Sequence, residues 1–112
     1  MPILTLGGMR QQKTWAPGEN FTLADVGKDC EDNFEKIIDR ALQLGINHFE
    51  TARGYGSSEL QFGPVIKKHK RESFILQTKV CPSPDAATFR KSLETSFEKL
   101  QLEGDDEYID LF

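Results

Sequence analysis

The 112-residue sequence has only two cysteines, Cys30 and Cys81, and neither belongs to a CxxC or Cys/His motif. This argues against zinc ligation and favours two free thiols over a disulfide. The sequence also lacks any apolar run near the roughly 18–20 residues that a membrane-spanning helix needs. Residues 1–6 lack the basic region and cleavage site of a signal peptide. We therefore expect a cytoplasmic protein with no metal site and no membrane partner.

Basic residues are outnumbered by acidic ones. Fourteen Lys and Arg against 18 Asp and Glu give a formal net charge of -4. Nucleic-acid-binding domains normally carry a basic face, so we expect no nucleic-acid partner. Hydrophobic residues make up 38% of the sequence, which is enough for one core and favours a single domain over residues 1–112.

Four short apolar runs are typical of β-strands, because each is bounded by glycine, proline or charged residues. They cover residues 3–6, 46–51, 74–80 and 108–112. A long segment, about residues 7–28, separates the first strand from the next regular pattern. A loop of this length is uncommon unless it covers a site. We interpret this segment as a loop that covers a functional site, and the alternative is a disordered insertion.

Three helices are predicted between the strands from apolar residues at helical spacing. The first covers residues 31–44, with Asp29 as its N-cap and Gly45 at a left-handed C-terminal position. The second begins at a capping box, residues 58–61, and runs to about residue 70 with a kink or restart at Pro64. The third has Pro84 at its first position and an apolar face that extends to Leu100.

The resulting order is β-α-β-α-β-α-β, which indicates parallel strands joined by right-handed crossovers. The predicted fold class is therefore α/β, as the amino-terminal half of a (β/α)8 TIM barrel. Four strands are too few to close such a barrel.

Three polar residues stand where the predicted strands end, which is where barrels of this type place catalytic groups. Glu50 and Lys79 close the second and third strands, and Tyr55 follows Glu50 in the adjoining loop. One register directs Glu50 and Lys79 to the same side, where they would form an ion pair. An ammonium beside a phenol stabilises the phenolate and makes the phenol a better proton donor. Taken singly, Tyr55 is more simply explained as part of a turn that leads into a helix cap. A lone Lys79 is usually a solvated strand end, and Glu50 alone could be an ordinary charge at the rim.

Residues 45–59, Gly-Ile-Asn-His-Phe-Glu-Thr-Ala-Arg-Gly-Tyr-Gly-Ser-Ser-Glu, resemble the signature of the aldo-keto reductase superfamily around its second strand. Residues 74–79 resemble its strand-three lysine motif. Residues 6–10 and 108–112 are similar to its first strand with the following loop and to its fourth strand. The stretches Glu-Thr-Ala-Arg-Gly-Tyr-Gly and Gly-Gly-Met-Arg resemble a prokaryotic branch of predicted aldo-keto reductases. The resemblance implies a TIM barrel that reduces a small carbonyl substrate with NADPH or NADH.

The resemblance also implies roles for individual residues. Tyr55 would be the general acid, and Lys79 would make its hydroxyl a better proton donor. Glu50 would replace the family's aspartate and belong to both the catalytic and the cofactor-binding residues. The first loop would approach the nicotinamide and its ribose through Gly8, Met9 and Arg10. The longer Glu50 side chain would shift its carboxylate by about 1.5 Å, the length of a C–C bond. The family's catalytic histidine would fall after Phe112.

We therefore expect an oxidoreductase fragment whose parent reduces aldehydes or ketones, with cofactor bound only by the full-length barrel and little activity in this chain alone. The alternative is a non-catalytic interaction subunit, or a half-barrel that pairs with another half. Open strand edges predict self-association in either case.

Overall fold

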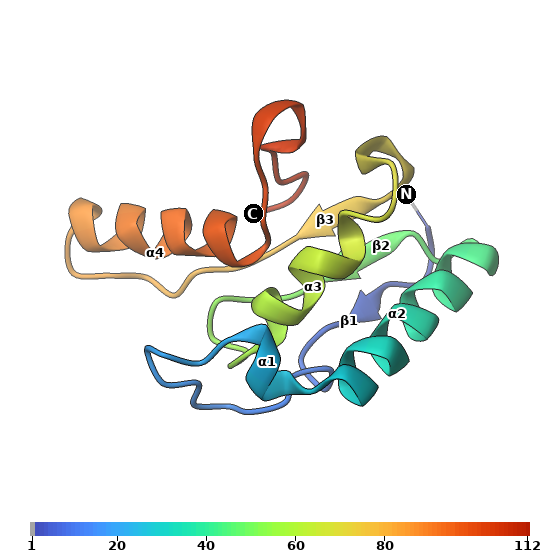
Figure 1. Cartoon of the computed structure of the whole chain (residues 1–112). Coiled ribbons are helices and arrows are strands. Elements are labelled where there is room, and N and C mark those ends of the chain that lie inside the picture. Colours follow the sequence, from blue (N-terminus) through green and yellow to red (C-terminus); the bar gives the residue numbers. More distant parts are fainter. Residues whose placement is uncertain (1) are drawn as a thin grey trace.

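The computed structural model describes residues 2–112, apart from the side chain of Asp106, and its centre is a three-stranded parallel sheet (Figure 1). The strands are β1 (Leu6–Gly7), β2 (His48–Glu50) and β3 (Ile75–Gln77), in the order β1-β2-β3. Phe49 pairs with Leu6 on one side and with Leu76 on the other. The predicted α/β class with parallel strands is confirmed.

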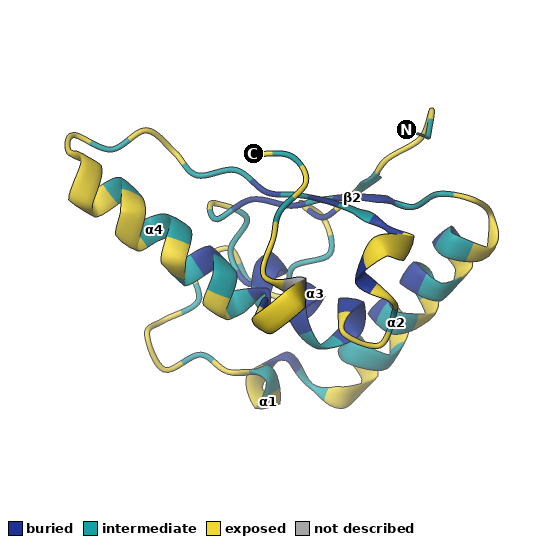
Figure 2. Ribbon diagram, turned by 90° about the horizontal axis from the view of Figure 1, so that it is seen from above, coloured by how far each residue is buried: buried dark blue, intermediate teal, exposed yellow. Residues whose placement is uncertain are grey.

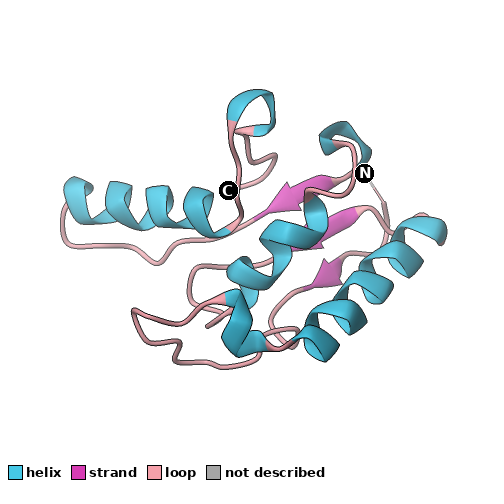
Figure 3. Cartoon of the chain, viewed as in Figure 1, coloured by secondary structure: helices cyan, strands magenta, loops and turns pink. Residues whose placement is uncertain are grey.

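The helices alternate with the strands along the chain (Figure 3). They are α1 (Leu23–Val26), α2 (Lys28–Gln43), α3 (Ser58–Ile66) and α4 (Ala86–Lys99), with short 3₁₀ turns η1 (Arg71–Ser73) and η2 (Gly104–Asp106). Figure 2 shows that these four α-helices lie on one side of the sheet. This one-sided arrangement leaves the other face to carry polar side chains.

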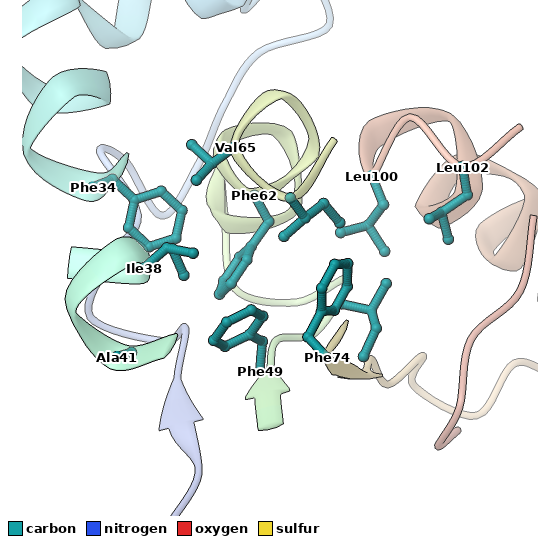
Figure 4. Packing of buried hydrophobic residues seen from close by; sticks show 11 residues of the cluster. Phe34, Ile38, Ala41, Phe49, Phe62, Val65, Phe74, Leu100 and Leu102 are labelled. Atoms are coloured by element: carbon teal, nitrogen blue, oxygen red, sulfur yellow. The ribbon is translucent and has the colours of Figure 1, made fainter. Parts of the chain in front are cut away.

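The hydrophobic core lies between the sheet and the helices, where alternate strand residues point toward α2 and α3 (Figure 4). Phe49 and Leu76 are completely buried there. Phe62 of α3 contacts Phe34 of α2 edge to face, with ring centroids 4.8 Å apart, a favourable aromatic geometry. The core therefore fixes which strand residues face away from the helices.

The opposite face of the sheet carries a chain of polar side chains that runs from Thr5, just before β1, through β2 to β3. The Thr5 hydroxyl is 2.9 Å from His48 Nδ1, and His48 Nε2 is 2.9 Å from Gln77 Oε1. Both ring nitrogens of His48 have partners, so this buried histidine satisfies its polar atoms within the sheet. Glu50 and Gln77 are paired in register on the same face.

The regular strands are shorter than predicted: β2 and β3 cover His48–Glu50 and Ile75–Gln77 instead of residues 46–51 and 74–80. The first and last predicted strands differ most from the structure. β1 begins at Leu6, and Ile3 and Leu4 are exposed, because a strand forms only where a neighbouring strand pairs with it. Residues 108–112 run beside β3 but make only one parallel bridge, Gln77 to Leu111, with Asp110 N donating to Leu76 O at 3.0 Å. A regular fourth strand over residues 108–112 was therefore a wrong prediction, although the segment lies at that edge of the sheet.

The predicted helix termini were only partly right. α2 begins at Lys28 after Gly27, so Asp29 is not its N-cap, whereas Gly45 takes the expected left-handed conformation with φ +79°. α4 begins after Asp85, whose carboxylate accepts a hydrogen bond from Thr88 N at 2.8 Å, so Pro84 precedes the helix. A carboxylate at an N-cap satisfies an otherwise unpaired N–H group, which proline cannot do.

α3 also differs from its prediction, since it passes through Pro64 without a restart and ends at Ile66. Proline removes only one backbone donor, and the short helix tolerates that loss.

The predicted capping box of α3 has another use. Ser58 Oγ donates to Gly8 O at 3.0 Å, and Gln61 Nε2 donates to Gln11 O at 2.8 Å. Ser57 Oγ accepts a hydrogen bond from Lys13 N at 2.9 Å. The polar side chains at the start of α3 therefore bind the backbone of the long loop, whose later part forms α1.

Candidate functional site

Glu50, Tyr55 and Lys79 meet at the carboxyl ends of β2 and β3. Lys79 Nζ forms an ion pair with Glu50 Oε1 and lies 4.8 Å from the centroid of the Tyr55 ring. The Tyr55 hydroxyl donates a long hydrogen bond of 3.4 Å to the same oxygen, Glu50 Oε1. The register expected from the sequence places these side chains on one face of the sheet.

Backbone hydrogen bonds beyond the strands hold Lys79 in place. Thr51 N donates to Gln77 O at 2.9 Å, and Arg53 N donates to Lys79 O at 2.8 Å. These bonds continue the β2–β3 ladder past the regular strands, so Lys79 stays beside the segment that leads to Tyr55. Lys79 Nζ also donates to Thr51 O at 3.2 Å.

A tight turn presents Tyr55. Tyr55 N donates to Ala52 O, and Ser58 N donates to Tyr55 O, each at 3.0 Å. Gly56 follows with φ +55°, and a Cβ there would lie 2.0 Å from Thr14 O. Only glycine fits this conformation and this close approach of the long loop.

The environment of Lys79 acts on its charge in two ways. Partial burial lowers the pKa of Lys79 below its usual value, because desolvation disfavours an ammonium. The Glu50 carboxylate and the face of the Tyr55 ring both favour the charged form. An ammonium partly removed from water and next to a phenol is suited to stabilising a phenolate.

The first loop reaches this site through Gly8. Gly8 N donates to Glu50 O at 2.6 Å, and a Cβ on Gly8 would lie 2.5 Å from Phe62 Cε2. Gly8 is buried, so its place in the structure is explained by packing. Met9 and Arg10 are exposed just beyond it.

Behind the site lies a buried carboxylate that the sequence had marked only as the last residue of a signature. Glu59 is 1% exposed, Thr78 donates to its Oε1 at 2.7 Å, and Arg53 Nη1 lies 3.5 Å from its Oε2. A short polar motif gives no sign of burial, so the sequence could not show that Glu59 contacts the residue preceding Lys79.

Two further findings concern ligands and membranes. Among the side chains that the structure describes, no three of His, Cys, Asp or Glu are grouped so as to hold a metal ion, and both cysteines are free. None of the helices within residues 2–112 is both long and apolar enough to cross a membrane.

The carboxylate, phenol and ammonium lie where the strands of this parallel α/β sheet end, which is where (β/α)-barrel proteins place their catalytic groups. Residues 4–112 match the model of the Aldo/keto reductase family. The chain therefore belongs to that family.

The chain is similar to L-galactose dehydrogenase of Arabidopsis thaliana, with 33% identity over 94 residues that cover 76% of this chain and 28% of that protein. It is also similar to a solved thermostable aldo-keto reductase in complex with the inhibitor epalrestat. Identity there is 24% and the TM-score is 0.73, over 97% of this chain and 36% of the other. The holo form of an aldo-keto reductase from Bacillus halodurans matches at 26% identity and a TM-score of 0.61, over 96% and 35% of the two chains. The chain thus spans about a third of the length of these relatives.

Proposed function

We propose that the protein to which this chain belongs reduces aldehydes or ketones with NADPH or NADH, and that Tyr55 is the proton donor. The observation that carries the proposal is the convergence of the Lys79 ammonium and the Glu50 carboxylate on Tyr55. A scaffold has no physical need for that arrangement. Family membership supports a carbonyl substrate and a nicotinamide cofactor.

A reduced nicotinamide held beside residues 8–10 and Glu50 would supply the hydride for the carbonyl carbon. The Tyr55 hydroxyl donates its proton to the carbonyl oxygen, so that the product is an alcohol. Lys79 stabilises the resulting phenolate, and Glu50 orients and partly neutralises Lys79. Solvent then returns a proton to Tyr55.

The residues of the first loop fit one edge of the cofactor. Met9 offers an apolar surface and Arg10 a cation for an anionic group, both in the segment that begins at Gly8. Glu50, at the end of β2 and bonded through its backbone to Gly8, offers a hydrogen-bond acceptor. Gly8 allows this segment to pass close over Glu50. We assign Gly8, Met9, Arg10 and Glu50 to the cofactor side of the site.

Because the chain spans about a third of its relatives, we propose that the full-length barrel is needed for firm cofactor binding and for turnover. The 112-residue chain alone is then expected to bind NADPH weakly in a fluorescence titration. Micromolar binding by that chain would contradict this part of the proposal.

The main test is carbonyl reduction by the whole protein, followed as loss of reduced-nicotinamide absorbance with a panel of aldehydes and ketones. Tyr55→Phe is expected to lower kcat by about 10²–10⁴-fold, the range for a general acid. The matched control is Tyr108→Phe, which removes the hydroxyl of the chain's other tyrosine. Full activity in Tyr55→Phe, or no reduction of any carbonyl by the wild type, would refute the proposal.

A second candidate is a non-catalytic interaction subunit or half-barrel partner. The observation that favours it is an open cavity of about 690 Å³ along α4, lined partly by Leu93, Phe97 and Leu102. None of Glu50, Tyr55 and Lys79 lines this cavity, so binding there would be separate from the chemistry proposed above.

A further inference from the structure

Glu59 contacts the segment that carries Lys79. It lies in the first turn of α3, 1% exposed, on the helix side of the sheet. Its Oε1 accepts a hydrogen bond of 2.7 Å from the Thr78 hydroxyl. Thr78 is completely buried and immediately precedes Lys79, so this bond holds the backbone from which the Lys79 side chain extends.

The other oxygen of Glu59 faces the segment that carries Tyr55. Glu59 Oε2 is 3.5 Å from Arg53 Nη1 and has no hydrogen-bond partner among the described residues. Arg53 lies two positions before Tyr55, and Arg53 N donates to Lys79 O at 2.8 Å. One carboxylate therefore joins the two segments from beneath the sheet.

Stability alone does not explain an acidic residue at this position. Burial raises the pKa of Glu59, and Thr78, Ser96 and Arg53 only oppose that rise. Well-packed apolar side chains can often replace a buried ion pair without loss of stability. The carboxylate is therefore better explained by what it holds in place.

We propose that Glu59 is a positioning residue for the Tyr55–Lys79 pair. It acts through Arg53 on one side and Thr78 on the other, and keeps the two segments at the separation at which the Lys79 ammonium lies over the Tyr55 ring. An effect of Glu59 on catalysis rests on the proposed function, because it requires that Tyr55 and Lys79 act in carbonyl reduction. The contact itself exists whether or not the protein reduces carbonyls.

The contact can be measured by NMR in the 112-residue chain, without cofactor or substrate. Lys79 Nζ lies over the Tyr55 ring, 4.8 Å from its centroid. The ε-methylene protons on the adjacent carbon are therefore expected to show an upfield ring-current shift, which Tyr55→Leu abolishes. Glu59→Gln keeps an oxygen for Thr78 but loses the charge opposite Arg53. This variant is expected to lose most of the upfield shift, while the amide resonances of Phe49 and Leu76 in the core stay in place.

The control is Val65→Ala, which truncates another buried residue of α3. Val65 belongs to the apolar core, and its side chain has no polar atom with which to bond Arg53 or Thr78. This control variant is expected to lower stability and to retain the ring-current shift. Arg53→Met removes the contact of Glu59 with Arg53, and Thr78→Val removes its hydrogen bond with Thr78. Each is expected to lose most of the upfield shift. These two variants replace Glu59→Gln in the test if Glu59→Gln does not fold.

The proposal would be overturned if Glu59→Gln kept the upfield shift of the Lys79 protons, or if Arg53→Met and Thr78→Val both kept it. An equal loss of that shift in Val65→Ala would also overturn it. Failure of the whole protein to reduce carbonyls would refute the proposed function and leave this result unchanged.

Discussion

At the level of one residue, the glycine at position 8 in the stretch 6–10 has two possible explanations, close packing and cofactor binding. The resemblance assigns it to the cofactor side of the site. In the structure a Cβ at Gly8 would lie 2.5 Å from Phe62 Cε2 and 2.8 Å from Glu50 O. Because Glu50 O is a backbone atom of β2, it cannot move aside as a flexible side chain could. Packing against the sheet alone is sufficient to require glycine.

We predict that Gly8→Ala destabilises the chain by about 1–3 kcal/mol, the usual cost of overpacking a close contact. Urea unfolding is the measurement. Gly18→Ala is the control, because a Cβ at Gly18 meets nothing within 4 Å and should leave the midpoint almost unchanged. Equal midpoints for the two variants would show that Gly8 is not held by these contacts.

The three site residues also differ in how far the sequence revealed them. Strand parity predicted that Glu50 and Lys79 share a face, and the ion pair between them agrees. The position of Tyr55 depends on a turn that Gly56 and the long loop hold together. Such contacts between distant segments leave no periodic signal in the sequence.

At the level of elements, one arginine attaches the last segment of the chain to β3. Arg71, 5% exposed, donates to Asp110 Oδ2 at 2.7 Å and to Tyr108 O at 2.9 Å, and its guanidinium lies 3.8 Å from the Tyr108 ring centroid. Asp110 Oδ2 in turn accepts a hydrogen bond from Leu76 N. The Asp110 carboxylate thus occupies the backbone N–H of Leu76, which a regular neighbouring strand would otherwise bond. Residues 108–112 therefore lie beside β3 with a single bridge.

We predict that Arg71→Met lowers the free energy of unfolding by about 3 kcal/mol, since removing one partner of a largely buried ion pair leaves the other without compensation. Chemical denaturation gives the value, and amide exchange should show increased exchange at Leu111. Lys28→Met breaks an exposed pair within α2 instead and should have no measurable effect. A similarly small effect of Arg71→Met would mean that the last segment is held by other contacts.

At the level of the whole molecule, α4 is the least covered of the α-helices in the part of the chain that the structure describes. Among its described residues only Ser96 is buried, and Leu93 and Phe97 remain partly exposed beside the cavity along the helix. Figure 2 shows that much of α4 lies away from the other helices. An apolar helix face of this kind usually contacts another surface.

We therefore predict that the 112-residue chain self-associates as its concentration rises, which sedimentation velocity would detect. Leu93→Lys places a charge in the apolar face and should shift the distribution toward monomer. Lys91→Ala, on the exposed side of the same helix, should not. A concentration-independent monomer in the wild type would contradict the prediction.

The sequence by itself determined the alternation of strands and helices, the parallel sheet and the common face of Glu50 and Lys79, because each follows from local periodicity and from chain geometry. Tertiary structure decided where β1 begins, why residues 108–112 form only a bridge, and that the side chains of Ser57, Ser58 and Gln61 bind a loop. It also placed the buried Glu59 beneath the Tyr55–Lys79 pair. These features depend on contacts between residues up to about 50 positions apart, and local sequence patterns carry no information about such contacts.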